Sequence, residues 1–276
     1  MRVPLGDGRI AQYWSGGASP GPVVLFFHGC PDTRRIAMTG EEAATEVGVR
    51  LLCVNRPGYG VSTAAASTHT SVARDATELL DLWGIEEVAV LGMSVGGPYA
   101  AAFAAAYPDR VSALGLVAPP AMTETADDTV EDAMERMRPE FEAWRTGIDP
   151  DDEDDEALAA RFLANLPTAD AALLGERGAE FVAGVIWEAL RQPGGYLRDA
   201  ALLLRTWDFR VEDVACPTTL WVGERDEKAM AAVPWWTERL PAADVHVAAD
   251  TSHLATLLGQ WPEILAAVSG RAAGSG

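Results

Sequence analysis

A Gly-x-Ser-x-Gly motif, set between an apolar run and an alanine-rich stretch, constrains the fold of this chain more than any other feature. Residues Gly92-Met93-Ser94-Val95-Gly96 follow the apolar run 88–91 and precede the alanine-rich segment 97–107. The motif alone is weak evidence, because glycine and serine are common in loops, but this context predicts a strand, a sharp turn and a helix. A serine on such a turn is presented at the end of a sheet as a nucleophile, and the flanking glycines give the backbone room to turn. Ser94 is therefore the candidate nucleophile.

A serine nucleophile needs a base, and the base needs an acid that orients it. The chain has four histidines: His28, His69, His246 and His253. His253 is the predicted base, because it follows a polar turn and begins the last apolar helical pattern. Asp226 is the predicted acid, because it comes just after the buried-strand pattern 218–222. Three nearby carboxylates stay open as rivals: Glu224, Glu227 and Asp250. His28, at the end of a strand pattern, is predicted to shape a loop through hydrogen bonds.

The tetrahedral intermediate of acyl transfer also needs hydrogen-bond donors for its oxyanion. The sequence His28-Gly29-Cys30-Pro31 follows the apolar run 23–27, which has the composition of a buried parallel strand. A loop leaving that strand is able to aim the backbone N–H of Cys30 at the point that the N–H of Val95 reaches. We predict these two N–H groups as the oxyanion donors; losing one such donor typically lowers the rate by about 10²–10³. The Cys30 thiol is the weaker candidate nucleophile, since Ser94 is present.

Taken together, these motifs resemble the α/β-hydrolase superfamily, in particular its serine hydrolases with a His-Gly-x-Pro oxyanion loop and an inserted helical cap. The matching segments run from near residue 20 to near residue 265: His28-Gly29-Cys30-Pro31, Arg56-Pro57-Gly58-Tyr59-Gly60, 92–97, Tyr107-Pro108-Asp109-Arg110-Val111, 223–226 and Ser252-His253-Leu254. The resemblance implies an eight-stranded, mainly parallel sheet, and the order Ser94, Asp226, His253 is the one expected for its catalytic triad. Asn55 stands where relatives usually carry Asp, at a position that is structural in the family.

Hydrophobic periodicity alternates between strand and helix along the chain, which predicts a doubly wound α/β fold. Strands are predicted at 9–14, 23–27, 50–54, 88–91, 111–117, 218–222 and 244–247. Helices are predicted at 35–47, 72–83, 98–107 and 253–269. From residue 126 to about residue 207 only helical patterns appear, among them 130–144, 156–166 and 173–191. We therefore predict a core domain of residues 1–120 and 210–270, a helical cap of residues 121–209 and a flexible tail of residues 271–276.

The cap of such a protein shapes the substrate pocket over the nucleophile. Six residues near the motifs or in the cap are the predicted pocket residues: His28, Met93, Met122, Trp144, Trp187 and Trp207. Phe141 and Phe162 are also available to line an apolar cleft. Aromatic residues at helical spacing are equally typical of a packed core, so these predictions depend on how the cap folds.

Charge and cysteine content limit the expected partners. The formal net charge of −20 argues against nucleic acid or an anionic membrane as a partner, and weakly against a strongly anionic substrate. The three cysteines are scattered and lack zinc-binding spacing, which predicts a reduced, cytoplasmic protein without a metal or cofactor. Residues 1–8 lack the apolar segment of a signal peptide, and no run approaches the ~20 apolar residues of a membrane span. A monomer or homodimer that acts on a small molecule is the expected form.

The predicted reaction is hydrolysis of a neutral, fairly apolar carboxylic ester, lactone or thioester through an acyl-enzyme intermediate. A serine at the turn argues against haloalkane dehalogenases and epoxide hydrolases, relatives whose nucleophile is an aspartate. Two alternatives stay open. One is an acyl transferase or cyclase of secondary metabolism that uses the same triad, and the other is a non-catalytic ligand-binding protein on the hydrolase fold.

Overall fold

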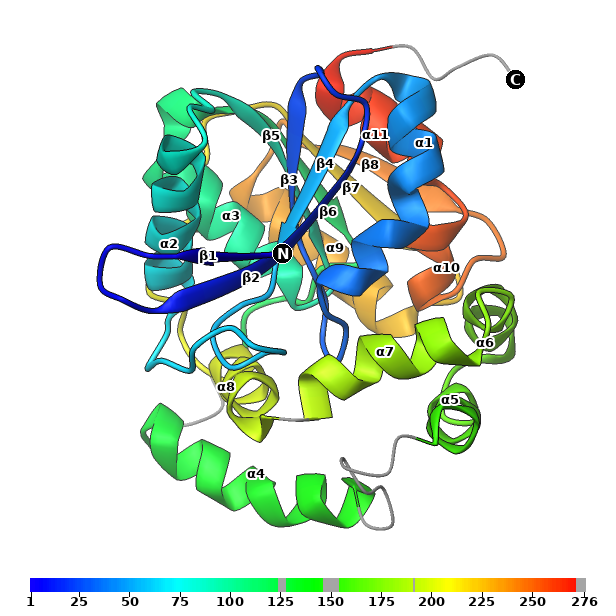
Figure 1. Ribbon diagram of the computed structural model, residues 1–276. Helices are drawn as coiled ribbons and strands as arrows, with labels where there is room; N and C mark the ends of the chain where they lie inside the picture. The colour runs from blue at the N-terminus through cyan, green and yellow to red at the C-terminus, as the bar shows by residue number, and fades with distance from the viewer. Residues whose placement is uncertain (124–127, 146–153, 191, 272–276) are drawn as a thin grey trace.

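An eight-stranded sheet runs through the computed structural model of the protein, which describes residues 1–123, 128–145, 154–190 and 192–271. The strands lie in the order β1-β2-β4-β3-β5-β6-β7-β8 (Figure 1). β2 pairs antiparallel with β1 and β4, and all other neighbouring strands pair parallel. The predicted doubly wound, mainly parallel eight-stranded sheet is thus confirmed. The strands are β1 (Arg2–Pro4), β2 (Ile10–Gly17), β3 (Val23–Phe27), β4 (Arg50–Val54), β5 (Val88–Met93), β6 (Val111–Val117), β7 (Thr218–Gly223) and β8 (Asp244–Ala248).

Helices connect the strands and cover the sheet. The α-helices are α1 (Glu41–Val47), α2 (His69–Leu82), α3 (Gly96–Ala106), α4 (Val130–Arg145), α5 (Asp155–Leu163), α6 (Thr168–Gly175), α7 (Ala179–Leu190), α8 (Pro193–Leu203), α9 (Glu227–Arg239), α10 (His253–Leu258) and α11 (Trp261–Ser269). The 3-10 helices are η1 (Arg34–Gly40), η2 (Pro108–Arg110) and η3 (Val211–Asp213).

The alternation of side chains along β3 divides the core into two layers. Val24 and Phe26 join a buried cluster with residues of α1 and α11. Val23, Leu25 and Phe27 join a second cluster with residues of α2 and α3. Figure 1 shows the same division, with α2 and α3 on one side of the sheet and α1 and α11 on the other. Because both faces are covered, β3 and β5 are apolar and buried along their whole length.

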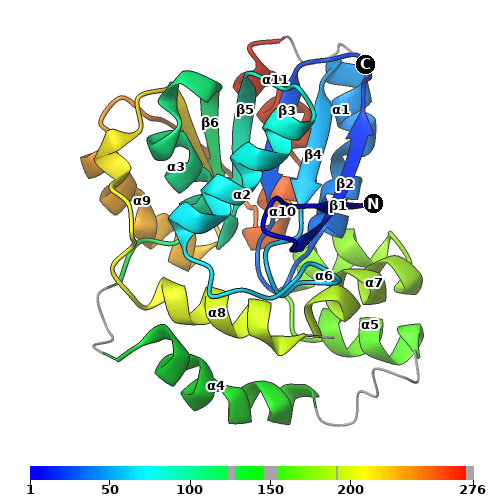
Figure 2. The ribbon, with the colours of Figure 1, turned by 60° about the vertical axis from the view of Figure 1, so that its left-hand side comes forward.

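Helices α4 to α8, which we call the inserted helices, follow β6 and precede β7 in the chain. They lie together beyond one end of the sheet (Figures 1 and 2). The loop that leaves the carboxyl end of β4 touches α8 directly, because a Cβ atom on Gly58 would lie 2.6 Å from the backbone nitrogen of Gly195. The inserted helices therefore face the carboxyl ends of the parallel strands, where the loops that carry the predicted site begin.

Some predicted elements are divided in the structure. The predicted helix 173–191 is the end of α6 and then α7, separated where Gly178 has a φ of 85°. The predicted helix 253–269 is α10 and α11, with Gln260 between them as the N-cap residue of α11. A break of this kind leaves the apolar pattern of the sequence unchanged. Hydrophobic periodicity therefore predicts one continuous helix where the structure has two. The sequence pattern does not predict α9, because this helix contains Pro234 and an internal proline weakens a helical signal. Residues 272–276 of the predicted tail lie outside the described residues.

Candidate active site

Ser94 occupies a sharp turn between the end of β5 and the start of α3. Its φ of 51° lies in the left-handed region, its N–H donates to the Val117 carbonyl at 2.8 Å, and its carbonyl accepts from the Gly97 N–H at 2.8 Å. Glycine is required beside it, because a Cβ atom on Gly96 would overlap the carbonyl oxygen of Phe27. This close approach sets the serine turn directly against the end of β3.

Asp226 and His253 are joined by a hydrogen bond between Oδ2 and Nδ1. Asp226 is buried at the N-cap of α9, where its Oδ1 also accepts the Ala229 N–H at 3.1 Å. Burial alone would raise the pKa of Asp226, but the hydrogen bonds from His253 and the Ala229 N–H outweigh it and hold the pKa below its ordinary value. The carboxylate is therefore ionised and accepts from Nδ1–H, which leaves Nε2 of His253 as the basic nitrogen.

The rival carboxylates have other roles among the described residues. Glu224 accepts the Asp250 N–H at 3.0 Å, and Asp250 pairs with Arg225 at 2.9 Å on the surface. Glu227 is exposed in the first turn of α9. Asp226 alone of the four candidate acids contacts His253 in this part of the chain.

The other three histidines lie in different surroundings. His28 is buried, with Nδ1 2.8 Å from the Gly29 carbonyl and Nε2 3.4 Å from the Arg56 backbone nitrogen. Burial and the Arg56 charge lower its pKa well below the ordinary value, so the ring is neutral and donates from Nδ1. His69 lies among aromatic rings of Tyr99, Trp207 and Phe209. His246 stacks on Trp221 at the β8 edge. His28 thus has the loop-shaping surroundings that the sequence predicts for it.

Arg56 fixes the orientation of the peptide bond between Gly29 and Cys30. Its guanidinium donates to the His28 carbonyl at 2.5 Å and to the Gly29 carbonyl at 2.9 Å. In a trans peptide the N–H points away from the C=O, so the Cys30 N–H points away from Arg56. Gly29 lies next to Ser94, since a Cβ atom on Gly29 would be 3.5 Å from the Ser94 Cβ. Neither the Cys30 N–H nor the Val95 N–H donates a hydrogen bond to any residue in the described part of the chain.

A buried carboxylate from the inserted helices completes this arrangement. Asp199 of α8 accepts from Arg56 at 2.6 Å, from the Tyr59 hydroxyl at 2.6 Å and from the Tyr99 hydroxyl at 2.7 Å. Arg56 and Asp199 are each 3% exposed, so the ion pair is shielded from solvent. The Tyr59 hydroxyl also lies 3.4 Å from the Cys30 sulfur, and burial raises the pKa of that thiol. Cys30 is therefore a protonated thiol and a poor nucleophile.

Asp32 is a titratable residue of the site that sequence reasoning missed. Asp32 is buried. A Cβ atom on Gly29, the residue next to Ser94, would lie 2.8 Å from Oδ2 of Asp32. Burial raises the pKa of Asp32 to about 6, although the charges of His253 and Arg56 act in the opposite direction. The only sequence signal was its place directly after the His-Gly-x-Pro motif.

A cavity of about 350 Å³ opens between the loop that follows β3 and the inserted helices. Pro31, the residue after Cys30, forms one wall. The other lining residues come from the inserted helices and the segment after α5, and most are apolar: Met137, Glu140, Phe141, Phe162, Asn165, Leu166, Leu190, Tyr196 and Ala200. Phe141 and Phe162, which the sequence offered for an apolar cleft, lie here.

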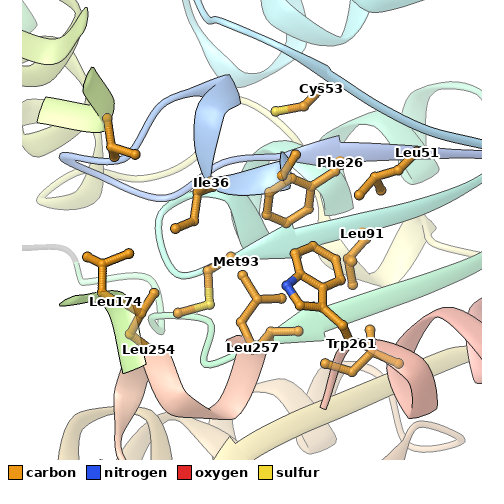
Figure 3. Close-up of a cluster of buried hydrophobic side chains, with 14 of the residues drawn as sticks. Phe26, Ile36, Leu51, Cys53, Leu91, Met93, Leu174, Leu254, Leu257 and Trp261 are labelled. Atoms are coloured by element: carbon orange, nitrogen blue, oxygen red, sulfur yellow. The ribbon is translucent and has the colours of Figure 1, made fainter. Parts of the chain in front are cut away.

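The six predicted pocket residues lie elsewhere or outside the described residues. The His28 ring is hydrogen bonded to the backbone of Gly29 and Arg56. Met93 belongs to the buried cluster with Leu254 and Leu257 (Figure 3). The Met122 sulfur is 3.3 Å from the Trp207 backbone nitrogen, and Trp207 packs in an aromatic cluster. Trp187 donates to Asp155 at 3.1 Å and lines a polar cavity. The side chain of Trp144 lies outside the described residues. Aromatic residues of the inserted helices thus divide between core and cavity in a way that helical spacing does not distinguish.

The described residues contain neither a metal-binding cluster nor a membrane-spanning helix. No group of three or more His, Cys, Asp or Glu side chains in them is arranged to hold a metal ion. No helix in them is long and apolar enough to cross a bilayer.

Comparison with known proteins agrees with this fold. A family model described as alpha/beta hydrolase fold matches residues 22–260, and the chain therefore belongs to the α/β-hydrolase family. It is 31% identical over 238 residues to the pimeloyl-[acyl-carrier protein] methyl ester esterase of Chromobacterium violaceum, a match covering 84% of this chain and 87% of that protein.

Two solved structures share the fold. A thermophilic esterase from Thermogutta terrifontis has a TM-score of 0.71 at 23% identity, covering 98% of this chain and 99% of that one. The enol-lactonase from Burkholderia xenovorans LB400 has a TM-score of 0.72 at 19% identity, covering 97% of this chain and 98% of that one. The family and these relatives together support a hydrolase.

Proposed function

We propose that the protein is a serine hydrolase that cleaves neutral, fairly apolar carboxylic esters, with Ser94, His253 and Asp226 as its catalytic triad. The observation that carries the proposal is the hydrogen bond from His253 Nδ1 to the buried, ionised Asp226, in a chain whose Ser94 stands on a left-handed turn. A carboxylate in this position holds the imidazole in one tautomer and stabilises the imidazolium that forms during acyl transfer.

The proposed reaction has two acyl-transfer steps. Nε2 of His253 takes the Ser94 proton as Oγ attacks the carbonyl carbon, and the N–H groups of Cys30 and Val95 stabilise the oxyanion. The bond to the leaving alcohol breaks, and the alcohol takes the proton from His253. Water then attacks the acyl-enzyme, gives its proton to His253, and displaces Ser94 Oγ, which recovers that proton as the acid leaves.

The cavity beside Pro31 supports an apolar substrate portion. Its walls are mainly aliphatic and aromatic, and Glu140 is an exposed residue of its lining. A carboxylate there disfavours an anionic group, while the apolar walls favour a hydrocarbon chain. Two relatives are named as esterases and one as an enol-lactonase, which agrees with an ester or lactone as substrate.

We also propose that residues 121–209 act as a cap over a core of residues 1–120 and 210–270, in a cytoplasmic monomer or homodimer without a cofactor. The support for the cap is the position of the inserted helices over the loops that follow β3 and β4.

The test is covalent labelling of the protein with a small fluorophosphonate, followed by intact mass. One adduct is expected on the wild type and none on Ser94→Ala. Asp226→Asn should turn over p-nitrophenyl esters about 10⁴-fold more slowly, because the wrong tautomer of His253 is held. Asp250→Asn is the matched control and should be close to the wild type. An unlabelled wild type would contradict the proposal, and ester products formed with an added alcohol acceptor would identify an acyl transferase instead.

A further inference from the structure

The catalytic histidine stands in the first turn of a very short helix. α10 begins at His253 and ends at Leu258. The first N–H groups of a helix have no partner within it, and a serine at the N-cap ordinarily accepts one of them through its own hydroxyl. Ser252 occupies the N-cap of α10, but its side chain makes no such bond.

Asp170 of α6 supplies this cap from the inserted helices. Its Oδ1 accepts the Ala255 N–H at 2.8 Å, which is the N–H that an N-cap side chain usually satisfies. The same oxygen accepts the Ser252 hydroxyl at 2.6 Å. Asp170 is only 1% exposed, so both bonds are shielded from water. A buried carboxylate also complements the positive end of the helix dipole and accepts stronger hydrogen bonds than a neutral group.

Apolar contacts support the same junction between α6 and α10. Leu174, one turn after Asp170, belongs to the buried cluster that contains Leu254 and Leu257. Figure 3 shows Leu174 beside Leu254, with Met93, the residue before Ser94, close to both. His253 is thus held from two sides. Asp226 of the core bonds its ring, and α6 holds the backbone that carries it.

We propose that Asp170 is a positioning residue for His253, so that seating of the inserted helices on the core and assembly of the catalytic site are one event. The inference rests on the proposed function, in which His253 is the base. Its physical basis is that a displacement of about 1 Å at a catalytic group lowers the rate by up to about 10²-fold. Without the carboxylate, the first turn of α10 loses its anchor to α6 and His253 gains freedom relative to Ser94.

Two readouts test the proposal, and one of them is independent of catalysis. Amide hydrogen exchange should become at least tenfold faster in residues 253–258 of Asp170→Ala, because the Ala255 N–H loses its acceptor. Fluorophosphonate labelling of Ser94 and kcat should each fall about 10–100-fold, with KM changed less than about threefold. Because the Ser252 hydroxyl is able to turn and cap α10 in that variant, Asp170→Ala/Ser252→Ala should show the larger loss.

Asp154→Ala is the matched control. Asp154 caps α5 through the same kind of bond, to the Ala157 N–H at 2.9 Å, but it contacts no part of α10 in the described residues. Its labelling rate should match the wild type. Asp170→Asn keeps an oxygen acceptor at the cap and should retain slow exchange and labelling within about threefold of the wild type. If Asp170→Ala does not fold, exchange and labelling of Asp170→Asn test the proposal in its place.

Faster exchange in residues 253–258 with unchanged labelling would overturn the proposal, since the cap would then be structural only. Lost labelling in Asp170→Asn with unchanged exchange would overturn it as well, because position would not be the cause. Absence of labelling in the wild type would instead contradict the proposed function and leave the exchange result readable.

Discussion

Arg56 and Asp199 form a buried ion pair that orients the peptide bond between Gly29 and Cys30 at the candidate site. Arg56 holds the carbonyls of His28 and Gly29, and Asp199 holds Arg56 together with Tyr59 and Tyr99. A buried charge is costly unless it is paired and hydrogen bonded, and removing one partner of a buried pair typically costs about 3–5 kcal/mol. The orientation of the Cys30 N–H is therefore tied to α8 through Arg56 and Asp199.

Asp32 carries the first prediction at this scale. Its pKa of about 6 lies above the ordinary 3.8, so the folded protein binds this proton more tightly than the unfolded chain does. The buried carboxylate consequently destabilises the fold above pH 6, by at most about 3 kcal/mol at ~1.4 kcal/mol per pKa unit. Asp32→Asn should raise the free energy of unfolding at pH 8, and this gain should shrink as the pH falls through 6 towards 4.

Urea denaturation at pH 8 and pH 4.5 measures this difference. The exposed Asp250→Asn should change the free energy of unfolding by less than about 0.5 kcal/mol at either pH. An equal gain from Asp32→Asn at both pH values would show that the ionised carboxylate is not the cause.

Individual site residues differ in how far the sequence could predict them. Ser94, Asp226 and His253 stand in local motifs, and the hydrogen bond between Asp226 and His253 agrees with that pairing. Asp170 and Asp199 carry no local signal, because the residues they bond lie 82 and 85 positions away for Asp170 and 100 to 143 positions away for Asp199. Their roles depend on how the inserted helices dock, which hydrophobic periodicity does not specify.

At the scale of elements, α7 is fastened to the core by the carboxylate of Glu188. Glu188 accepts from Arg34 at 2.6 Å, from Arg35 at 3.2 Å and from the Asn55 amide at 2.8 Å. The side-chain oxygen Oδ1 of Asn55 in turn accepts the backbone N–H of Arg34 at 2.7 Å. The sequence showed Asn55 only as a departure from the Asp of relatives. The structure gives it a physical reason, since an amide is able to donate to Glu188 and a carboxylate is not.

Asn55→Asp should therefore weaken the attachment of α7. The change removes a donor from Glu188 and places two carboxylates in contact, which should lower the free energy of unfolding at pH 8 by roughly 2 kcal/mol or more. Thermal denaturation at pH 8 measures the loss. The double variant Asn55→Asp/Glu188→Gln reverses the polarity of the bond, with Gln as donor, and should recover most of the stability. A double variant no better than Asn55→Asp alone would refute the charge explanation.

Strands were easier to predict than helices for a physical reason. β3 to β7 are buried and rich in β-branched and aliphatic residues, so short apolar runs identify them. The break between α6 and α7 falls at Gly178, directly before α7, and the positive φ of this residue does not alter the apolar pattern of the sequence. The number of strands and their mainly parallel pairing followed from the resemblance to a known family, whereas the arrangement of α4 to α8 followed from neither source.

At the scale of the whole molecule, the sheet and the inserted helices divide the proposed work. Ser94 follows β5, Asp226 follows β7 and His253 begins α10, so all three belong to the sheet and the helices that cover it. Nearly all walls of the cavity belong to the inserted helices. The proposed function thus assigns chemistry and selectivity to different parts of the chain, which Asp199, Glu188 and Asp170 join. A change in the cavity should therefore alter which ester is cleaved and leave the reactivity of Ser94 intact.

Ala200 tests this division, because it lines the cavity on α8. Ala200→Trp should fill space that a long acyl chain needs, and each buried methylene is worth about 0.8 kcal/mol. We expect kcat/KM for p-nitrophenyl octanoate to fall at least tenfold, while that for p-nitrophenyl acetate and the labelling rate of Ser94 stay within about threefold. Ala242→Trp, which lines a separate hollow beside β8, is the control and should change neither ester. Equal losses on acetate and octanoate would mean that Ala200 acts on the catalytic groups, and no loss on either would mean that the acyl chain lies outside this cavity.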